Sequence, residues 1–558
     1  MSNFFGFGAI STDVYKLGHA DMYQKGTDMV YGNLTPRSNR LFKAPAGYDG
    51  KMVVVGTTAG IQEIHANWQR FFNMEKEAAL EIYMEYVEAA LGVGTVSRDR
   101  MAALHNLGYL PVRVKSLPEG SRVKMKTPVL TIKNTHKDFS WVVNFLETAI
   151  SQITWPTMTT ATIAAEYRRI LTKWATITGT PLEAIDWQAH DFSARGLMGP
   201  EAAARVGVGH LSSFYGSDTV QAAHYIKQTY DTSSVGLLFG SVPATEHAVS
   251  SSNILFIERM LKRGDLPVNE AVLDVLHRGE VAGLNTRELA ELLFLHHYIT
   301  VLFPTGIVSY VSDTYDYWAV LTRILPVLKP EIMARDGKLV VRPDSGDPLL
   351  IVAGMKEGFE FRRSGRTGVA YKLSDWKGAA LVQEIAKLTP IPEHEVDGSI
   401  DTLYKIFGGT ITETGHKQLD SHIGLIYGDS ITLERANNIL AALEDKGYAS
   451  GNIVFGVGSF TYQYITRDTF GFAVKATATS VDEEFIEIFK DPATGDKLKK
   501  SAKGYMLVAE GRDGDYEMVD CVSEYEEGFG ALEEIYRDGV LIAKANFATI
   551  RERVKAGL

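Results

Sequence analysis

The sequence predicts an α/β protein in which an α+β segment precedes a parallel β-sheet, either open or closed into a barrel. From about residue 185, short apolar strands end in polar or glycine-rich loops and are followed by helices, which is the pattern of parallel strand–helix units. Before residue 180, alternating apolar residues with Pro-Glu-Gly punctuation indicate antiparallel strands mixed with helices.

Length and composition are those of an ordinary globular protein. The chain has 558 residues, 45% hydrophobic and 22% charged, which is room for roughly three or four domains. Lys plus Arg number 57 and Asp plus Glu 68, so the net charge of −11 disfavours a general nucleic-acid binder. Cys521 is the only cysteine, which excludes an intrachain disulfide framework. No apolar run reaches the ~18 residues of a membrane span, so we expect a cytoplasmic protein with no membrane contact.

The first part of the chain contains four interpretable segments. Residues 52–55 are typical of a buried strand, and apolar spacing over 80–91 predicts a helix that stops at Gly92. Residues 111–133 predict antiparallel strands, and 141–178 predict a helix.

The end of the chain returns to strand-like pieces after residue 480, including 504–509. We therefore expect residues 1–184 and 480–558 to form one discontinuous α+β domain, and residues 185–479 to form the catalytic α/β domain. A charged, glycine-rich stretch at about 356–415 interrupts the strand–helix alternation. We expect it to be a peripheral insertion without a catalytic role.

Four strands of the second part lead directly into polar loops. They cover 307–311, 339–341, 424–427 and 453–455, and the third loop precedes a helix over 433–443. Because functional groups of parallel α/β folds gather at the C-terminal ends of the strands, these loops are the candidate site.

The last two of these loops favour a phosphate. Gly428-Asp429 and Gly456-Val457-Gly458-Ser459 each lie between a strand and a helix, where backbone N–H groups can approach an anion. Asp429 suits sugar hydroxyls, because a carboxylate accepts several hydrogen bonds. Tight-turn packing explains a single Gly-x-Gly equally well.

Acidic and basic side chains follow the two earlier strands. Arg342 offers a planar fork to phosphate oxygens, and Asp344 suits a ribose or hydrated Mg²⁺; a structural Arg–Asp pair at a turn is the alternative. For Asp313 we favour function, whereas for Asp316 we favour a helix-start role, since acids there stabilise the helix dipole.

Three further segments carry reactive or flat side chains. His247 suits a general base, a phosphate contact or a phosphoryl acceptor, although an arbitrary histidine more often has none of these roles. Phe192 supplies an aromatic face three residues before Arg195, with core packing as the alternative. Asp218 follows a glycine turn, where it suits a helix cap as well. The sequence has no Gly-x-x-x-x-Gly-Lys-Ser/Thr, His-Glu-x-x-His or Gly-x-Ser-x-Gly motif.

Nine segments resemble, in order and approximate spacing, the nicotinamide phosphoribosyltransferase family of type II phosphoribosyltransferases. Each is short, but the ordered series spans nearly the whole chain apart from the insertion. The segments are TDVYKLGHADMY (12–23), HDFSARG (190–196), GSDT (216–219), SVPATEH (241–247), VSDTYD (311–316), RPDSGDP (342–348), YGD (427–429), FGVGS (455–459) and TRD (466–468).

The resemblance implies an irregular (β/α) barrel with a discontinuous β-rich domain. It also implies a homodimer with active sites at the subunit interface. The implied reaction joins nicotinamide to 5-phosphoribosyl 1-pyrophosphate, giving nicotinamide mononucleotide and pyrophosphate in NAD salvage. Mg²⁺ is the implied cofactor, and ATP hydrolysis assists through a phosphorylated histidine.

The resemblance also implies roles for individual residues. His247 would be the phosphorylated histidine, Asp218 would accept from the carboxamide N–H₂, and Phe192 would stack on the pyridine ring against Tyr15 of the partner subunit. The groups implied to surround the ribose and its Mg²⁺, bound directly or through water, are Asp313, Asp344, Gly428 and Asp429.

The implied phosphate contacts form a second group. Gly458 and Ser459 would hold the 5′-phosphate, and Ser459 departs from the glycine that the family often has there. The residues implied to contact phosphate or pyrophosphate are Arg195, Arg342 and Arg467, with Arg37, Lys475 and Lys490 as further candidates.

Two other functions are weighed against this one. A nicotinate phosphoribosyltransferase would bring an anionic carboxylate to Asp218, which repels it, whereas an amide donates to it. A non-catalytic binding protein on the same scaffold is allowed by fold alone. The retained set of His247, Arg342, Asp344, Asp429 and Arg467 favours an enzyme.

Overall fold

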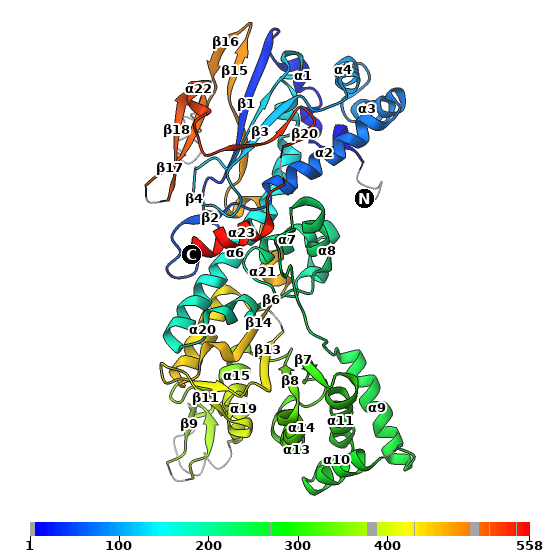
Figure 1. Cartoon of the computed structure of the whole chain (residues 1–558), viewed down its shortest axis with the longest axis vertical. Helices are drawn as coiled ribbons and strands as arrows, with labels where there is room; N and C mark the ends of the chain where they lie inside the picture. Colours follow the sequence, from blue (N-terminus) through cyan, green and yellow to red (C-terminus); the bar gives the residue numbers. More distant parts are fainter. Residues whose placement is uncertain are drawn as a thin grey trace.

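The structure is a computed structural model that describes residues 6–267, 269–365, 367–376, 388–428, 430–490, 502–512, 514–542 and 544–558. The described chain forms two main sheets, one parallel and one antiparallel, joined by a long helix (Figure 1). No helix in these ranges is both long and apolar enough to cross a bilayer.

The parallel sheet has five strands, each paired in parallel with its neighbour. The four predicted strands of this region are confirmed, and a fifth includes the first two residues of the HDFSARG segment. In spatial order the strands are β6 (Ala189–Asp191), β14 (Ile453–Val457), β13 (Ile423–Tyr427), β8 (Asp336–Arg342) and β7 (Thr305–Val311).

Single-residue bridges link the two edges of this sheet. Between β6 and β7 run two extended segments that form no regular strand but pair in parallel with their neighbours at isolated positions. The curled sheet is therefore an irregular barrel, as the resemblance implied. The bridges are Asp191–Ser217, Gly216–Gly240 and Ala244–Ser309.

The antiparallel sheet has seven strands and combines both ends of the chain. The antiparallel strands predicted over 111–133 are confirmed by β3 and β5, which pair directly. In spatial order the strands are β16 (Glu484–Glu487), β15 (Ala473–Val481), β1 (Thr27–Thr35), β5 (Leu130–Asn134), β3 (Val112–Ser116), β19 (Glu533–Arg537) and β20 (Val540–Leu541).

Helix α6 (Glu147–Thr178) connects the two sheets. It confirms the helix predicted over 141–178, together with the short α5 (Val142–Phe145). It ends at Gly179, whose φ of +72° is a conformation that glycine adopts without strain. Figure 1 shows α6 running from the antiparallel sheet toward the barrel, so one rigid element fixes the two parts relative to each other.

Other helices cover the two sheets. In the first half they are α1 (His19–Met22), α2 (Thr57–Asn73), α3 (Lys76–Leu91), α4 (Asp99–Leu107), α7 (Pro200–Leu211), α8 (Val220–Thr229), α9 (His247–Arg263), α10 (Glu270–Val281) and α11 (Thr286–His297). In the second half they are α12 (Tyr317–Ala319), α13 (Leu325–Val327), α14 (Lys329–Ala334), α15 (Pro348–Ala353), α16 (Leu373–Trp376), α18 (Glu393–Asp397), α19 (Ser399–Phe407), α20 (Leu433–Asp445), α21 (Ser459–Gln463), α22 (Glu524–Glu527) and α23 (Phe547–Ala556).

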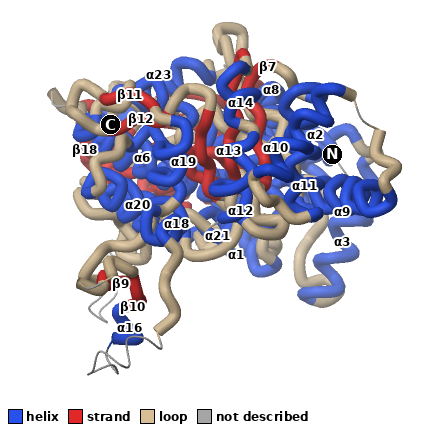
Figure 2. Tube along the Cα trace, turned by 90° about the horizontal axis from the view of Figure 1, so that it is seen from below, coloured by secondary structure: helices blue, strands red, loops and turns tan. Residues whose placement is uncertain are grey.

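The stretch predicted as an insertion has two kinds of structure. A small hairpin with α16 projects from the body of the molecule (Figure 2), whereas α19 buries Ile400, Leu403 and Phe407 in the barrel core. The remaining two-stranded sheets are β9 (Phe361–Arg363) with β10 (Ala370–Lys372), β11 (Gly409–Ile411) with β12 (Lys417–Leu419), β2 (Lys51–Val53) with β4 (Arg122–Lys124), and β17 (Tyr505–Glu510) with β18 (Tyr516–Val522).

Candidate active site

The polar loops at the C-terminal ends of the barrel strands meet at one mouth of the barrel. His247, which begins α9, lies with its Nε2 3.8 Å from Asp313 Oδ1 and 4.0 Å from Asp344 Oδ2. Its Nδ1 is 3.2 Å from the Thr314 hydroxyl. Three residues that are 31 or more positions apart in the sequence thus share one cluster.

Asp313 is held in place through one of its two oxygens. Oδ2 accepts the backbone N–H of Asp344 at 3.0 Å and the Ser345 hydroxyl at 2.6 Å. Oδ1 is buried and has no hydrogen-bond partner among the residues that the structure describes. Since buried polar atoms are almost always paired, this oxygen is available to a ligand.

The loop after β8 is held in place by a hydrogen-bonding side chain of the neighbouring strand β13. The buried hydroxyl of Tyr427 donates toward the carbonyls of Ser345 and Gly346, at 3.1 and 2.9 Å. Arg342 donates from Nη2 to the Thr245 carbonyl at 3.4 Å. Its buried Nε has no hydrogen-bond partner within the described ranges. An unsatisfied guanidinium donor and an unsatisfied carboxylate oxygen, at the ends of the neighbouring strands β8 and β7, offer a donor and an acceptor to a charged ligand.

Gly428 allows β13 to end close to this cluster. A Cβ at this position would lie 2.5 Å from Asp344 Oδ1, so any side chain would push the carboxylate away. The next residue, Asp429, lies outside the described residues, and its predicted role stays a prediction.

Asp218 lies on the bridge segment beside β6. Its Oδ1 accepts the Nε2–H of His190 at 2.9 Å and the Ser241 hydroxyl at 2.5 Å. Burial opposes ionisation of Asp218, but these two hydrogen bonds outweigh burial and hold its pKa below the ordinary value. The nearby Arg342 guanidinium acts in the same direction. Asp218 is therefore an anion at neutral pH.

A second carboxylate organises the loops on both sides of Asp218. Asp191 is fully buried; its Oδ1 accepts from the backbone N–H and hydroxyl of Ser193, and its Oδ2 accepts from the Thr219 hydroxyl at 2.8 Å. This residue joins the loop after β6 to the turn that carries Asp218.

Aromatic and glycine residues shape the floor next to Asp218. The rings of His190 and Phe192 lie 4.6 Å apart. A Cβ on Gly456 would lie 2.8 Å from the Phe192 ring, so this glycine lets β14 approach the aromatic side chain. Phe192 is only partly buried, which leaves it available to stack on a flat ligand.

Ser459 and Arg195 lie on the same side of the mouth. Gly196 packs so closely against the Ser459 side chain that a Cβ on Gly196 would overlap it. Arg195 is exposed in the adjoining turn, and Gly458 directly precedes α21. The structure thus brings together Phe192, Arg195, Asp218, His247, Asp313, Arg342, Asp344, Gly428, Gly458 and Ser459 around the barrel mouth.

Two predicted phosphate contacts form a separate basic pair. Arg37 donates from Nε to the Gly471 carbonyl at 2.8 Å. Burial lowers the pKa of Arg37, and the neighbouring guanidinium of Arg467 lowers it further. Two cations held together in this way favour a multiply charged anion.

The other predicted residues lie away from the mouth. Tyr15 is 59% exposed near the start of the chain, where its ring contacts His19. Lys475 is exposed on β15, and Lys490 is exposed after β16. Their predicted contacts with substrate, including that of Tyr15 across a subunit interface, stay predictions.

The chemistry of the cluster fits a Mg²⁺ ion that arrives with a phosphorylated ligand. In the part of the chain that the structure describes, no group of three or more His, Cys, Asp or Glu residues is placed to hold a metal. The bare Oδ1 of Asp313 and the Asp344 carboxylate nonetheless match the one or two carboxylates that typically hold Mg²⁺ together with substrate phosphates.

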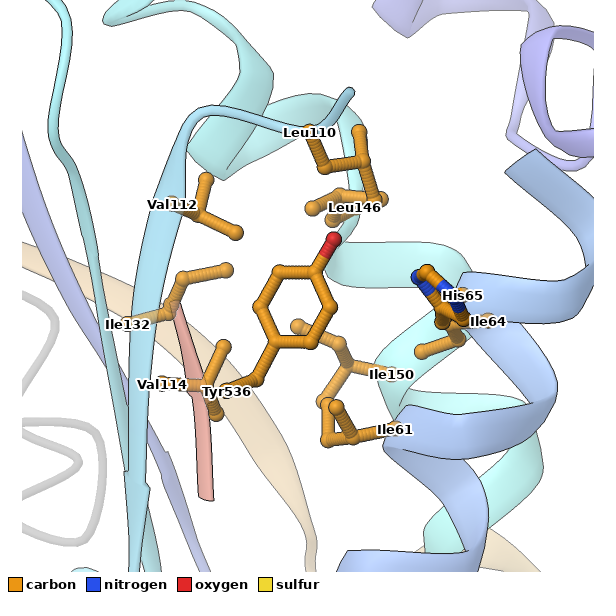
Figure 3. Close-up of a pocket in the computed structure, with 10 residues that line it drawn as sticks. All are labelled: Ile61, Ile64, His65, Leu110, Val112, Val114, Ile132, Leu146, Ile150 and Tyr536. Carbon is orange, nitrogen blue, oxygen red and sulfur yellow. The ribbon is translucent and has the colours of Figure 1, made fainter. Parts of the chain in front are cut away.

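A small cavity elsewhere in the molecule is not a second site of this kind. It measures about 10 Å³ and lies in the antiparallel part, where aliphatic side chains, His65 and Tyr536 line it (Figure 3). A space of one water molecule among apolar side chains is a packing gap.

Sequence reasoning did not identify three residues of this site. His190 and Ser241 fall within the predicted segments, yet nothing in the sequence shows that both bind Asp218, which is 28 and 23 positions away. Thr314 was likewise unassigned. The only local signal was their position at strand ends.

Comparisons with known proteins identify relatives of this chain. A nicotinamide phosphoribosyltransferase of Acinetobacter baylyi is 41% identical over 97% of this chain and 96% of its own length. One from Mycoplasma pneumoniae is 29% identical over 89% of this chain and 94% of its own. The crystal structure of human nicotinic acid phosphoribosyltransferase superposes with a TM-score of 0.54 at 16% identity, covering 98% of this chain and 93% of that one, and shows the same fold.

Residues 187–527, more than half of the 558 residues, match the sequence profile of one family. With the extended similarity to the Acinetobacter baylyi protein and the shared barrel, the chain belongs to the nicotinate phosphoribosyltransferase (NAPRTase) family.

Proposed function

We propose that this chain is a nicotinamide phosphoribosyltransferase. It transfers the 5-phosphoribosyl group of 5-phosphoribosyl 1-pyrophosphate to the ring nitrogen of nicotinamide and releases pyrophosphate, in NAD biosynthesis. The curated relatives carry that name. We expect the reaction to take place in the cytoplasm.

The single observation that carries the choice of nicotinamide is the state of Asp218. Both of its hydrogen bonds reach Oδ1, so Oδ2 remains to accept from a ligand. An ionised carboxylate accepts the N–H₂ of a carboxamide but repels the carboxylate of nicotinate. Phe192, beside His190, offers one face for the neutral pyridine ring.

The cluster of His247, Asp313, Arg342 and Asp344 suits the phosphoribosyl donor. Substitution at C1′ develops positive charge on the ribose and negative charge on the leaving pyrophosphate. Preorganised carboxylates stabilise the first and a guanidinium the second. Asp313 Oδ1 and the Asp344 carboxylate would hold Mg²⁺, which neutralises pyrophosphate charge when bound.

His247 is the proposed site of ATP coupling. An imidazole nitrogen attacks the γ-phosphorus of ATP, the bond to the bridging oxygen breaks, and ADP leaves. Water later takes the phosphoryl group, giving inorganic phosphate and free histidine. Half of the His247 side chain is exposed, which gives a nucleotide access. We also propose a homodimer in which Tyr15 of one subunit completes the partner's ring site.

A direct assay tests this function. Purified protein is given labelled nicotinamide, 5-phosphoribosyl 1-pyrophosphate and Mg²⁺, with and without ATP, and nicotinamide mononucleotide is measured. We expect product from nicotinamide far above product from nicotinate, and stimulation by ATP that the substitution His247→Ala abolishes. A preference for nicotinate contradicts the proposed substrate, and full ATP stimulation of the variant contradicts the role of His247.

A further inference from the structure

We infer that Arg551, on the C-terminal helix α23, is a positioning residue for the carboxamide pocket, because it joins the two chain segments that carry Asp218 and Ser241. The inference rests on the proposed function and adds to it a determinant of nicotinamide binding outside the barrel mouth. Figure 1 shows α23 lying between the antiparallel sheet and the barrel.

The guanidinium of Arg551 makes three hydrogen bonds to backbone carbonyls. Nε donates to Leu211 at 2.7 Å, Nη1 donates to Leu237 at 2.7 Å, and Nη2 donates to Leu238. Leu211 ends α7, whereas Leu237 and Leu238 precede the second bridge segment. One rigid fork therefore helps to set the spacing of two loops, which α8 connects along the chain and which also pair directly at Gly216 and Gly240.

These loops lead directly to Asp218 and Ser241, whose side chains are hydrogen-bonded to each other in the pocket. The Arg551 guanidinium also lies 4.4 Å from the centre of the Tyr215 ring. Tyr215 accepts the N–H of Gly240 at 2.9 Å, and Gly240 accepts the N–H of Ser217 at 3.1 Å. Asp218 is the next residue after Ser217, and Ser241 is the next after Gly240, so the chain of contacts ends at the Ser241–Asp218 hydrogen bond.

The burial of the Arg551 guanidinium indicates that it depends on these carbonyls for hydrogen bonds. Its side chain is almost fully buried, at 5% exposure. Among the described residues it forms no ion pair with a carboxylate within 4 Å, and burial lowers its pKa to about 10. A buried guanidinium without a carboxylate is costly unless each donor is satisfied. The three carbonyls can accept these hydrogen bonds only while both loops keep their positions.

The attachment of α23 itself does not depend on Arg551 alone. Phe547, Ile550 and Val554 bury their side chains in a core cluster. Arg553 reaches the Glu119 carbonyl in the antiparallel part. Loss of the Arg551 fork is therefore expected to loosen the two loops while the helix stays in place.

The test uses the full-length protein and three variants. Arg551→Met removes the fork but keeps an apolar stem, Arg551→Lys keeps the charge with a single donor group, and Arg553→Met is the control on the same helix. For each we measure nicotinamide binding by calorimetry, KM for each substrate, kcat, the ratio of nicotinamide to nicotinate turnover, and thermal unfolding.

We expect Arg551→Met to raise the Kd and KM for nicotinamide about tenfold, the scale of effect that small displacements of binding groups produce. KM for 5-phosphoribosyl 1-pyrophosphate should stay within about twofold, whereas selectivity over nicotinate should fall. Arg551→Lys should be intermediate, and Arg553→Met should match the wild type in all substrate constants.

Four results would overturn the inference while leaving the proposed function intact. One is wild-type nicotinamide binding by a folded Arg551→Met protein. Another is an equal change in both substrates' KM, or the same change in Arg553→Met. If Arg551→Met does not fold, wild-type constants in Arg551→Lys overturn it instead. A wild-type protein that neither binds nor converts nicotinamide contradicts the proposed function itself.

Discussion

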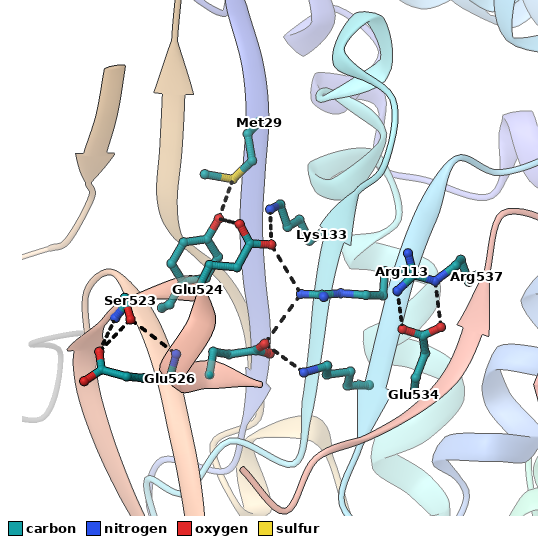
Figure 4. Close-up of polar contacts among 11 residues, drawn as sticks. Met29, Arg113, Lys133, Ser523, Glu524, Glu526, Glu534 and Arg537 are labelled. Carbon is teal, nitrogen blue, oxygen red and sulfur yellow. Dashed lines mark hydrogen bonds and ion pairs between the residues drawn. The ribbon is translucent and has the colours of Figure 1, made fainter. Parts of the chain in front are cut away.

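Two charged regions of the molecule contain the same residue types but differ in how their charges are compensated. On the antiparallel sheet, Lys133 pairs with Glu524 at 2.5 Å, and Arg537 forms a two-pronged contact with Glu534 (Figure 4). Lys115 pairs with the almost fully buried Glu527 at 2.8 Å. At the barrel mouth, by contrast, Arg342 Nε and Asp313 Oδ1 are buried without a hydrogen-bond partner in the described part of the chain.

The difference distinguishes charges that stabilise the fold from charges that await a ligand. In the sheet region the three cations just named each have a carboxylate partner. Glu527 Oε1 has no hydrogen-bond partner among the described residues, but its Oε2 contacts both Lys115 and Arg113. At the mouth, groups of opposite charge are held apart by their own loops, which leaves hydrogen-bonding capacity unused. Substitutions in the two regions should therefore affect different quantities.

The largest expected effect is on catalysis. Asp313→Asn should lower kcat/KM by about 10²–10³-fold, because a preorganised charge at the reacting centre is lost, while thermal unfolding stays close to that of the wild type. Asp316→Asn in the same loop is the control, since an asparagine still accepts from the Ala319 N–H that Asp316 caps. Comparable activity of both variants would contradict the expectation that Asp313, unlike Asp316, acts in catalysis.

The next effect is on stability alone. Lys115→Met should lower the free energy of unfolding by about 3 kcal/mol, because Glu527 then stays buried with its nearer cation removed. The exposed pair of Lys356 and Asp445 is the control, and Lys356→Met should cost less than about 0.5 kcal/mol. Denaturant unfolding measures both, and a fall in kcat/KM for Lys115→Met in folded protein would contradict the comparison.

Another buried carboxylate, outside the barrel mouth, extends the comparison between the two regions. Glu291 on α11 accepts the Tyr310 hydroxyl at 2.7 Å, and burial raises its pKa to about 7. The folded protein then binds one more proton than the unfolded chain between pH ~4.5 and ~7. This contribution to stability is fully present below that window and is lost as the pH rises through it.

Glu291→Gln should therefore flatten the pH dependence of unfolding over that window, by about 3 kcal/mol in total, with kcat unchanged. Denaturant titrations at pH 5, 6 and 7 measure the slope. An unchanged slope would show that Glu291 does not bind the extra proton.

The smallest expected effect is on substrate choice. Asp218→Asn should reduce the preference for nicotinamide over nicotinate about tenfold. The neutral side-chain amide of the variant does not repel the carboxylate of nicotinate and can donate a hydrogen bond to it. Competition assays with both substrates give the ratio. An unchanged ratio would remove the reason for choosing nicotinamide.

Much of the secondary structure was predictable because it depends on local pattern. The apolar spacing over 80–91 belongs to α3, which ends at Gly92 as predicted, and the strand predicted at 453–455 is the core of β14. Of two acids in one loop, Asp316 lies at the start of a helix as predicted, and its side chain caps that helix. The role preferred for Asp313 agrees with its bare oxygen but awaits the test above.

Long-range contacts were not predictable in this way. The barrel closes through single bridges at residues 217, 240 and 244, which lie in segments with no strand-like alternation. Helix α2 begins with N–H groups of Gly56 and Thr58 bound by Glu119, a cap from about 60 positions away that no local capping pattern contains.

The sequence by itself determined the strands, the loops that follow them and the residue types that those loops present, since these depend on neighbours a few positions apart. Only the tertiary structure decided which of those side chains meet, and which atoms stay unpaired. Arg551 contacts Leu211 across 340 positions. Asp313 accepts hydrogen bonds from Asp344 and Ser345 through Oδ2 but, among the described residues, none through Oδ1. Such outcomes depend on how whole elements pack, which no short stretch of sequence encodes.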